Sequence, residues 1–375
     1  MAEGDALRPR DAADVAEIIS THPRALAPAG AGSKRAIGHP VDADYLDLSV
    51  LAGILEYEPA ELVLCARAAT PLVTIEAALS AHGQRLAFEP PDFGRLLGMT
   101  VSQTLGGVLA ANLAGSRRVF AGAARDHFLG FNAVSGCGEV FKAGGKVVKN
   151  VTGYDLPKLL AGSWGTLAVL TDVTIRVAPA PEVERTLIVP TSTAEQGVAT
   201  LTAALGSPFE ISGAAFDPQQ GCLLRLEGFE SSVAARSAGV LRALGDPEAS
   251  QLHAEASRSL WRDIGDAAAL AGWPIVWRIS VPPSDATRVL AALDPARYLL
   301  DWGGGLIWAA YRELDAARVR GALRSGHATL LRAPLSARAQ NTPVFQPQSP
   351  ALAAVAARVK AAFDPHGKLN PGRMG

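Results

Sequence analysis

The chain has 375 residues, of which 49% are hydrophobic and 19% charged, and its formal net charge is −1. This composition is typical of a globular protein of two or three domains and excludes a disordered chain. No region has a strong basic excess, and the densest basic stretch, between Lys142 and Lys158, is too sparse for a nucleic-acid stripe. We therefore expect no nucleic-acid partner.

The cysteines and the apolar runs bear on location. Cys65, Cys137 and Cys222 are far apart and lack CxxC spacing, which favours a reducing compartment and argues against disulfides or a zinc site. The N-terminal stretch has no signal-peptide core. The longest apolar run, residues 267–277, is too short to span a bilayer. We expect a cytoplasmic protein that meets a membrane only through partners.

The first 180 residues alternate strands and helices. A helix is predicted over 11–20, strands over 45–49 and 61–68, and a helix over 70–84. This alternation is typical of an α/β unit. Strands follow between 127 and 150, and Gly144-Gly145 predicts a tight hairpin turn, because such turns require positive φ.

The pattern changes after "PAPE" at 179–182. Strands are predicted over 184–190, 210–216, 222–228, 273–281, 298–302, 305–311 and 328–334, with helices over 193–204, 230–243, 285–293 and 314–323. This pattern indicates an antiparallel sheet covered by helices, α+β in class. Residues 334–350 are rich in Pro and Gln and predict a loop, and the last helix is predicted over 351–363.

The first glycine-rich element is "PAGAGSK" at 28–34, which follows a strand. Its small residues let successive N–H groups form a concave nest for an anion. The element matches neither GxGxxG nor the Walker sequence, so a structural turn remains an alternative. Its candidate residues are Ala29, Gly30, Ala31, Gly32, Ser33 and Lys34.

The second element is "TLGGVLAANLAG" at 104–115. Thr104, Leu105, Gly106 and Gly107 open a predicted helix, whose N-terminal N–H groups favour a phosphate. Close packing of Ala and Gly between layers is the open alternative.

The third element, residues 149–179, holds a short predicted helix between glycines. Gly162 and Gly165 allow the backbone to approach a planar group closely. Asp126 and Asp155 suit local caps or turns. Together the three elements suit a ligand with a pyrophosphate and two flat ends.

These motifs resemble the FAD-binding domain of the vanillyl-alcohol-oxidase/PCMH type. Within that group they are similar to the FAD-binding subunits of bacterial glycolate oxidase (glycolate dehydrogenase) complexes, the GlcE type. The resemblance extends from near the start to the end of the chain. It rests on residues 28–34, 57–72, 86–94, 104–115, 125–130, 144–179, 301–308 and 363–374.

The resemblance implies a PCMH-type domain of two subdomains over 1–180, a small α+β antiparallel-sheet cap over 181–333, and a C-terminal segment over 334–375 that returns to the flavin domain. It implies noncovalent FAD, since His39, Cys65 and Cys137 are poor candidates for a covalent anchor. Residues 29–34 and 104–107 would surround the pyrophosphate. Asn112, Gly115 and Asp126 would lie on the flavin side, and Gly162, Gly165 and Val169 at the adenosine end.

The chain departs from the family in small ways at Leu105 and Thr152. Related 2-hydroxy-acid dehydrogenases carry a HxGDGNxH metal motif that is absent here, and the seven histidines show no metal-ligand spacing. No acid/base pair can be chosen from the sequence. Arginine suits a substrate carboxylate, but the sequence does not choose among Arg278, Arg312, Arg332 and Arg373.

The resemblance implies a subunit of a complex that oxidises glycolate, or a 2-hydroxy acid such as D-lactate, to glyoxylate or the matching oxo acid. Its implied partners are a larger FAD-linked subunit, which carries the substrate-oxidising site, and an iron–sulfur subunit. This chain lacks cysteines for a cluster of its own, so electrons would leave through a partner. The complex could lie at the inner membrane. Two alternatives remain: a stand-alone FAD-dependent oxidase or dehydrogenase, and a structural subunit without flavin.

Overall fold

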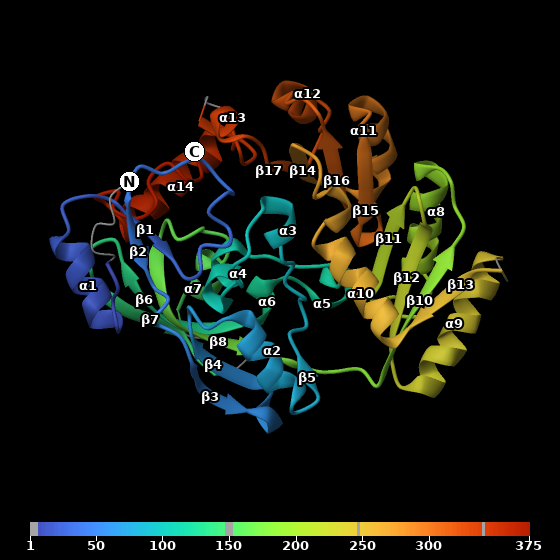
Figure 1. The fold of residues 1–375 in the computed structure, drawn as a ribbon, viewed down its shortest axis with the longest axis horizontal. Coiled ribbons are helices and arrows are strands. Elements are labelled where there is room, and N and C mark those ends of the chain that lie inside the picture. Colours follow the sequence, from blue (N-terminus) through green and yellow to red (C-terminus); the bar gives the residue numbers. More distant parts are fainter. Residues whose placement is uncertain (1–6, 147–152, 246–247, 340–341) are drawn as a thin grey trace.

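The computed structural model describes residues 7–146, 153–245, 248–339 and 342–375 (Figure 1). The N-terminal part holds two sheets. A parallel pair is formed by β1 (Leu26–Ala29) and β2 (Asp44–Asp47). A five-stranded antiparallel sheet has the order β3-β4-β8-β6-β7. Its strands are β3 (Ile54–Glu58), β4 (Val63–Arg67), β6 (Phe128–Ser135), β7 (Val140–Gly144) and β8 (Ala168–Arg176).

The five-stranded sheet refines the α/β expectation for residues 1–90. Among the described strands, β1 and β2 pair in parallel, whereas β3 and β4 pair antiparallel. The central strand β8 is buried at most positions, as its apolar sequence predicts. The second strand of the hairpin predicted at Gly144-Gly145 lies mainly outside the described residues.

Short helices surround these sheets. They are α1 (Ala12–Thr21), α2 (Leu72–Ser80), α3 (Gly94–Leu97), α4 (Leu105–Ala111), α5 (Arg118–Ala121), α6 (Ala124–His127) and α7 (Leu156–Leu160). A small pair of strands, β5 (Gln84–Arg85) and β9 (Ala178–Pro179), closes the N-terminal part.

An antiparallel sheet of eight strands follows, here named the cap sheet, with the order β13-β10-β12-β11-β15-β16-β14-β17. The predicted antiparallel sheet is confirmed. The strands are β10 (Val183–Val189), β11 (Gly213–Asp217), β12 (Gly221–Gly228), β13 (Ser250–His253), β14 (Ile275–Ser280), β15 (Arg297–Asp301), β16 (Leu306–Tyr311) and β17 (His327–Arg332).

Two cores divide the cap sheet by face. Trp277 and Phe216 point into one core with the helices α8 (Ala194–Leu205), α9 (Glu230–Leu244), α11 (Ala286–Leu293) and α12 (Ala316–Gly321). Trp302 and Trp308 belong instead to the core of the N-terminal part. The opposite face of the sheet therefore packs on the N-terminal part, which lies beside it in Figure 1.

Several helices of four or five residues, such as α3, α5 and α6, and one longer helix were not predicted from the sequence. Helix α10 (Ala254–Gly265) follows β13 and buries Ser257, Trp261 and Ile264 on one face. Their spacing of three and four residues is the helical signal that would have found it.

The C-terminal region returns to the N-terminal part, as expected. The predicted loop over 334–350 contains α13 (Leu335–Ala339), and Val344 is fully buried. Helix α14 (Pro350–Phe363) then leads back to β1, where the N–H of Leu26 donates to the carbonyl of Lys368 at 2.7 Å.

Candidate functional site

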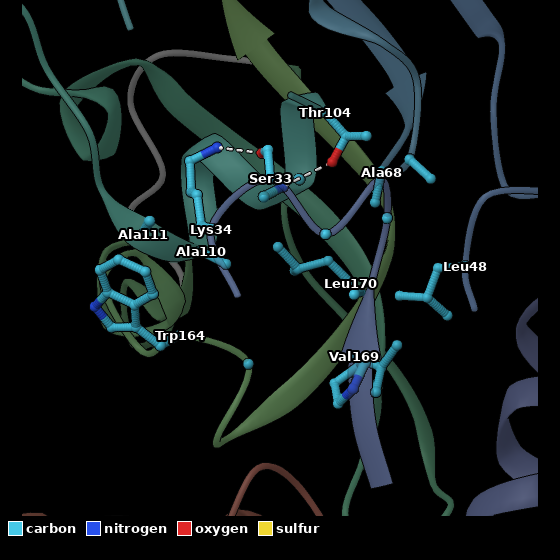
Figure 2. Close-up of a pocket in the computed structure, with 18 of the residues that line it drawn as sticks. Ser33, Lys34, Leu48, Ala68, Thr104, Ala110, Ala111, Trp164, Val169 and Leu170 are labelled. Carbon is cyan, nitrogen blue, oxygen red and sulfur yellow. Dashed lines mark hydrogen bonds between the residues drawn. The ribbon is translucent and has the colours of Figure 1, made fainter. Parts of the chain in front are cut away.

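Three segments that are far apart in the sequence line one groove: the loop after β1, the start of α4, and the turn into β8 (Figure 2). Each glycine-rich element predicted from the sequence contributes to it. The lining residues are Pro28, Ala29, Gly30, Gly32, Ser33, Lys34, Arg35, Leu48, Ala68, Ala69, Thr104, Gly106, Gly107, Ala110, Ala111, Trp164, Gly165, Ala168, Val169, Leu170 and Arg373.

The first two elements are pressed against each other. A β-carbon on Gly30 would come within 2.6 Å of Thr104 Oγ1, so the close approach requires glycine. Gly32 adopts a φ of 74°, in the region that favours glycine. Thr104 caps α4, its hydroxyl accepting the N–H of Gly107 at 3.3 Å.

Gly106 brings the start of α4 against β4. Its N–H donates to the carbonyl of Ala68 at 2.7 Å, and a β-carbon there would lie 2.7 Å from the β-carbon of Ala68. Any side chain at 106 would push α4 away from the groove. The glycine therefore serves packing and the shape of the groove together.

The third element forms the other wall. Asp155 caps α7, which confirms the local role predicted for it, and Gly165 has a φ of 68°. Trp164 donates its backbone N–H to the carbonyl of Ala110 at 2.9 Å, which fixes this turn to α4. The glycines that flank the short helix therefore let the turn bend around the groove.

The predicted cofactor residues divide into two groups. Ten line the groove: Ala29, Gly30, Gly32, Ser33, Lys34, Thr104, Gly106, Gly107, Gly165 and Val169. Of the remaining six, Ala31 lies in the same loop without lining the groove, and Leu105 is fully buried in the core.

The other four residues have local roles or lie elsewhere. Asn112 ends α4, and its Oδ1 accepts the N–H of Arg125 at 3.1 Å. Gly162 lies beside the Asn112 side chain. Asp126 accepts the N–H of Ala123 at 2.8 Å, the local role that the sequence also allowed. Gly115 lines a second cavity.

This second cavity lies between the N-terminal part and the cap sheet, with a volume of about 720 Å³. The groove itself encloses about 110 Å³, less than the roughly 300–1,000 Å³ of a typical small-molecule site. A dinucleotide in the groove must therefore extend further. Lys34 marks the junction, since its Nζ donates to Oε1 of Gln103 at 3.0 Å and Gln103 lines the second cavity.

Lys34 is one of three cationic residues that line the groove, with Arg35 and Arg373. Burial lowers the pKa of its ammonium group to about 8, and the carboxylate of Asp92 opposes that shift. A lysine with few anionic neighbours beside backbone N–H groups suits a phosphate. The N–H groups of Leu105, Gly106 and Gly107 already donate to the carbonyls of Thr70 and Ala68 and to the hydroxyl of Thr104. The residues present therefore fit a dinucleotide through the first element: the N–H groups of 30–34 would hold the pyrophosphate, and residues 164–170 the adenosine end.

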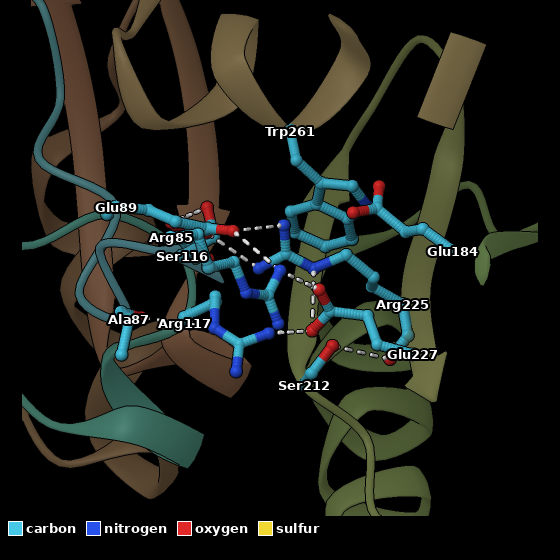
Figure 3. Close-up of polar contacts among 12 residues, drawn as sticks. Arg85, Ala87, Glu89, Ser116, Arg117, Glu184, Ser212, Arg225, Glu227 and Trp261 are labelled. Atoms are coloured by element: carbon cyan, nitrogen blue, oxygen red, sulfur yellow. Dashed lines mark hydrogen bonds and ion pairs between the residues drawn. The ribbon is translucent and has the colours of Figure 1, made fainter. Parts of the chain in front are cut away.

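A network of arginines and glutamates borders the second cavity (Figure 3). Arg225 of β12 donates to both carboxylate oxygens of Glu89, at 3.1 and 2.9 Å. Glu227 of β12 accepts from Arg85 and Arg117 of the N-terminal part. The network thus joins the cap sheet to the N-terminal part by charge-assisted bonds. Glu89 has a φ of 42°, an uncommon backbone conformation for a non-glycine residue.

Asp266 also lines the second cavity, at the end of α10. Burial raises the pKa of its carboxyl group to about 7, although the N–H of Asp92 donates to it at 2.6 Å. A carboxyl group that exchanges its proton near neutral pH suits general base catalysis. The sequence analysis missed Asp266, Arg225 and Glu227, because their neighbours come from distant segments.

The structure separates the four candidate arginines. Arg373 donates to the carbonyls of Lys34 and Ile37 and lines the groove. Arg332 donates to the carbonyl of Ala271. Arg312 stacks on Trp273 beside a separate cavity. Arg278 stacks on Trp302 and Trp308, on the face of the cap sheet that packs on the N-terminal part.

Across 7–146, 153–245, 248–339 and 342–375, no three His, Cys, Asp or Glu side chains group as metal ligands. Within those ranges no helix is both long and apolar enough to cross a bilayer. His39, Cys65 and Cys137 do not line the groove.

Comparison with known proteins agrees with this geometry. Residues 6–144 match the model of a FAD binding domain family. A glycolate oxidase subunit GlcD from Bacillus subtilis is 31% identical over 48% of this chain and 38% of its own length. A solved structure of alkyldihydroxyacetonephosphate synthase superposes with a TM-score of 0.67 over 97% of this chain and 76% of that one, at 16% identity, which shows a shared fold.

The whole chain has a similar relative. The glycolate oxidase subunit GlcE of Escherichia coli K12 is 37% identical over 350 residues, which cover 92% of this chain and 91% of that protein. This similarity extends over nearly the whole chain. The chain therefore belongs to the GlcE family of glycolate oxidase subunits, built on a PCMH-type FAD-binding fold.

Proposed function

We propose that this chain is the FAD-binding subunit of a complex that oxidises glycolate, or a related 2-hydroxy acid such as D-lactate, to the 2-oxo acid. The main support is one observation: a groove lined by three glycine-rich segments meets a larger cavity at Lys34 and Gln103. Such an arrangement suits a dinucleotide cofactor whose reactive end faces a substrate. Full-length similarity to GlcE supports the same substrate class.

The chain's own residues would divide the work. The groove would hold the pyrophosphate and the adenosine end of FAD, and the second cavity would receive the flavin ring and the substrate. When bound, FAD supplies the acceptor for the hydride that leaves the hydroxyl-bearing carbon. Asp266 is the cavity carboxylate suited to take the hydroxyl proton. The Arg225–Glu89 pair would hold the cap sheet in place over the cavity.

The proposed partners are a larger FAD-linked subunit similar to GlcD and an iron–sulfur subunit. The GlcD of Bacillus subtilis is named a glycolate oxidase subunit, and the similarity to it covers about half of this chain. The three cysteines lie apart, and Cys222 is buried while Cys137 is exposed. They do not suit a cluster, so electrons would leave through a partner. We propose that the complex sits on the cytoplasmic side of the inner membrane through these partners.

The test is purification of a tagged chain from its own host with the neighbouring genes intact. We expect two further subunits to copurify, and anaerobic glycolate to bleach the flavin absorbance of this complex. In the complex, Asp266→Asn should lower kcat by about 10²–10⁴-fold. A bare monomer would contradict the proposal. Bleaching of the isolated chain by glycolate would favour a stand-alone dehydrogenase instead.

A further inference from the structure

Two arginines from different parts of the fold stack on the same indole ring. The guanidinium carbon of Arg278, on β14, lies 4.8 Å from the ring centre of Trp302. That of Arg118, on α5, lies 4.8 Å from the same ring. Arg278 also lies 5.8 Å from the ring of Trp308, which Phe93 contacts edge-on. The pair therefore spans the boundary between the cap sheet and the N-terminal part.

Neither guanidinium has a direct anionic partner among the described residues. Among those residues, neither the Arg118 nor the Arg278 side chain forms an ion pair or a hydrogen bond, although each guanidinium has five N–H donors. The carboxylate of Asp301 is already engaged, accepting from Ser116 Oγ at 2.7 Å and from the N–H of Trp302 at 2.7 Å. Stacking on an aromatic ring leaves the in-plane N–H groups of a guanidinium free.

The pKa shifts at this boundary agree with positive charge that lacks a paired anion. Burial lowers the pKa of Arg278 to about 10, the charge of Arg118 lowers it further, and Asp301 only partly compensates. Burial also lowers the pKa of His327, with both arginines adding to the effect. Confined positive charge without a paired anion is costly, and a bound anion would remove that cost.

The backbone that carries Arg118 borders the second cavity, although neither arginine lines it. Gly115 and Ser116 line the cavity, and Arg118 lies two residues after Ser116. The indole N–H of Trp302 donates to the carbonyl of Gly115 at 3.0 Å, so one side chain joins the two places. Arg118 is exposed and Arg278 is half-buried.

We propose that Arg118 and Arg278 together bind one carboxylate group at this boundary. A carboxylate has two oxygens, and each can accept N–H bonds from one of the two guanidiniums. Resting on the proposed function, we assign this carboxylate to the small 2-hydroxy acid or its 2-oxo product. An acidic side chain of a partner subunit would present the same chemistry, and the test separates the two sources.

The test uses the purified complex with Arg118→Gln and, separately, Arg278→Gln. Arg312→Gln is the matched control, because Arg312 also stacks on a tryptophan but beside a separate cavity. Oxalate, an unreactive dicarboxylate, serves as the probe in equilibrium dialysis, and KM and kcat for glycolate are measured in parallel. Arg118→Gln changes an exposed side chain, so it keeps the test informative if Arg278→Gln fails to fold.

We expect each variant to weaken the binding of oxalate to this site by about 10- to 100-fold and to raise KM for glycolate by a similar factor. The control should leave both values unchanged. Unchanged oxalate binding in both variants would overturn the proposal. Unchanged oxalate binding with weakened subunit association would overturn the assignment to a small acid and indicate a partner's side chain. A wild-type complex inactive on glycolate, with oxalate binding still lost in the variants, would contradict the proposed function and leave this site standing.

Discussion

Gly30 and Thr104 touch so closely that a β-carbon at position 30 would lie 2.6 Å from Oγ1 and 2.9 Å from Cγ2 of Thr104. Each residue belongs to a different glycine-rich element. Their contact joins the loop after β1 to the start of α4, and both segments line the groove. The groove therefore depends on the absence of a side chain at one position.

Gly30→Ala should disturb this contact directly. The added methyl group must displace Thr104 and with it the start of α4, at a cost of about 1–3 kcal/mol in the free energy of unfolding. We expect FAD affinity to fall at least about tenfold, as measured by titration of flavin fluorescence. The control is Gly321→Ala in α12, where a β-carbon meets nothing within 4 Å. Wild-type affinity in Gly30→Ala would show that the contact is not needed for binding.

Lys34 should make FAD affinity depend on pH. Its pKa of about 8 in the free protein means that the ammonium charge is lost as pH rises through 8. Only the charged form attracts a pyrophosphate, so the dissociation constant of FAD should rise between pH 7 and pH 9, by at most about tenfold per unit. Lys34→Arg, which stays charged, should flatten the profile. An identical pH dependence in Lys34→Arg would assign the effect to another group.

Glu227 should contribute more to the free energy of unfolding than an exposed glutamate does. Its side chain is 5% exposed and accepts from Arg85 and Arg117 across the boundary with the cap sheet. Glu227→Gln leaves both arginines without their charge partner, so we expect a loss of about 3–5 kcal/mol in the free energy of unfolding.

The control for Glu227 is Glu255→Gln. Glu255 pairs with Arg258 and Arg262 but is 65% exposed, so its loss should change the free energy of unfolding little. Urea unfolding of both variants gives the comparison. Equal losses of unfolding free energy for the two substitutions would show that the boundary network stabilises the protein no more than an exposed ion pair does.

Asp266 should lower stability as pH rises. Its folded pKa of about 7 lies above the ordinary value of 3.8, so between these values the folded state holds a proton that the unfolded state releases. Stability from this group therefore falls as pH rises from about 4 to about 7 and stays low above. Asp266→Asn should be more stable than wild type at pH 8, by about 1–3 kcal/mol, with the difference vanishing toward pH 4.

A neighbour on the same helix is the control for Asp266. Asp263 is 57% exposed and pairs with Arg95 at 3.4 Å, so Asp263→Asn should change melting temperature little at any pH. Melting curves of both variants and of the wild type at several pH values give the comparison. A gain for Asp266→Asn that persists at pH 4 would mean that the effect is not electrostatic.

The sequence predicted the parts of the site that depend on local backbone chemistry. Glycine at 30, 106 and 165 is visible as a pattern because close approach or positive φ restricts the residue type. The antiparallel sheet after residue 182 was predicted from another local signal, the strong apolar patterns of its strands. Helix α10 was missed although its apolar spacing signals it.

The rest of the site depends on contacts between distant segments. Arg225 meets Glu89 only because β12 packs beside the loop after β5. Arg278 was one of four equivalent arginines in the sequence, and only the fold stacks it on Trp302. The perturbed pKa of Asp266 likewise results from burial at the boundary, which no local pattern encodes.

The most direct test of the central claim is the visible absorption spectrum of the purified chain, expressed alone and supplied with FAD. We predict a flavin spectrum that is released into the supernatant by acid precipitation, because FAD is held by the groove without a covalent bond. The Gly30→Ala protein should retain less flavin under the same conditions. A chain that stays colourless with added FAD would contradict the assignment of the groove as a complete FAD site.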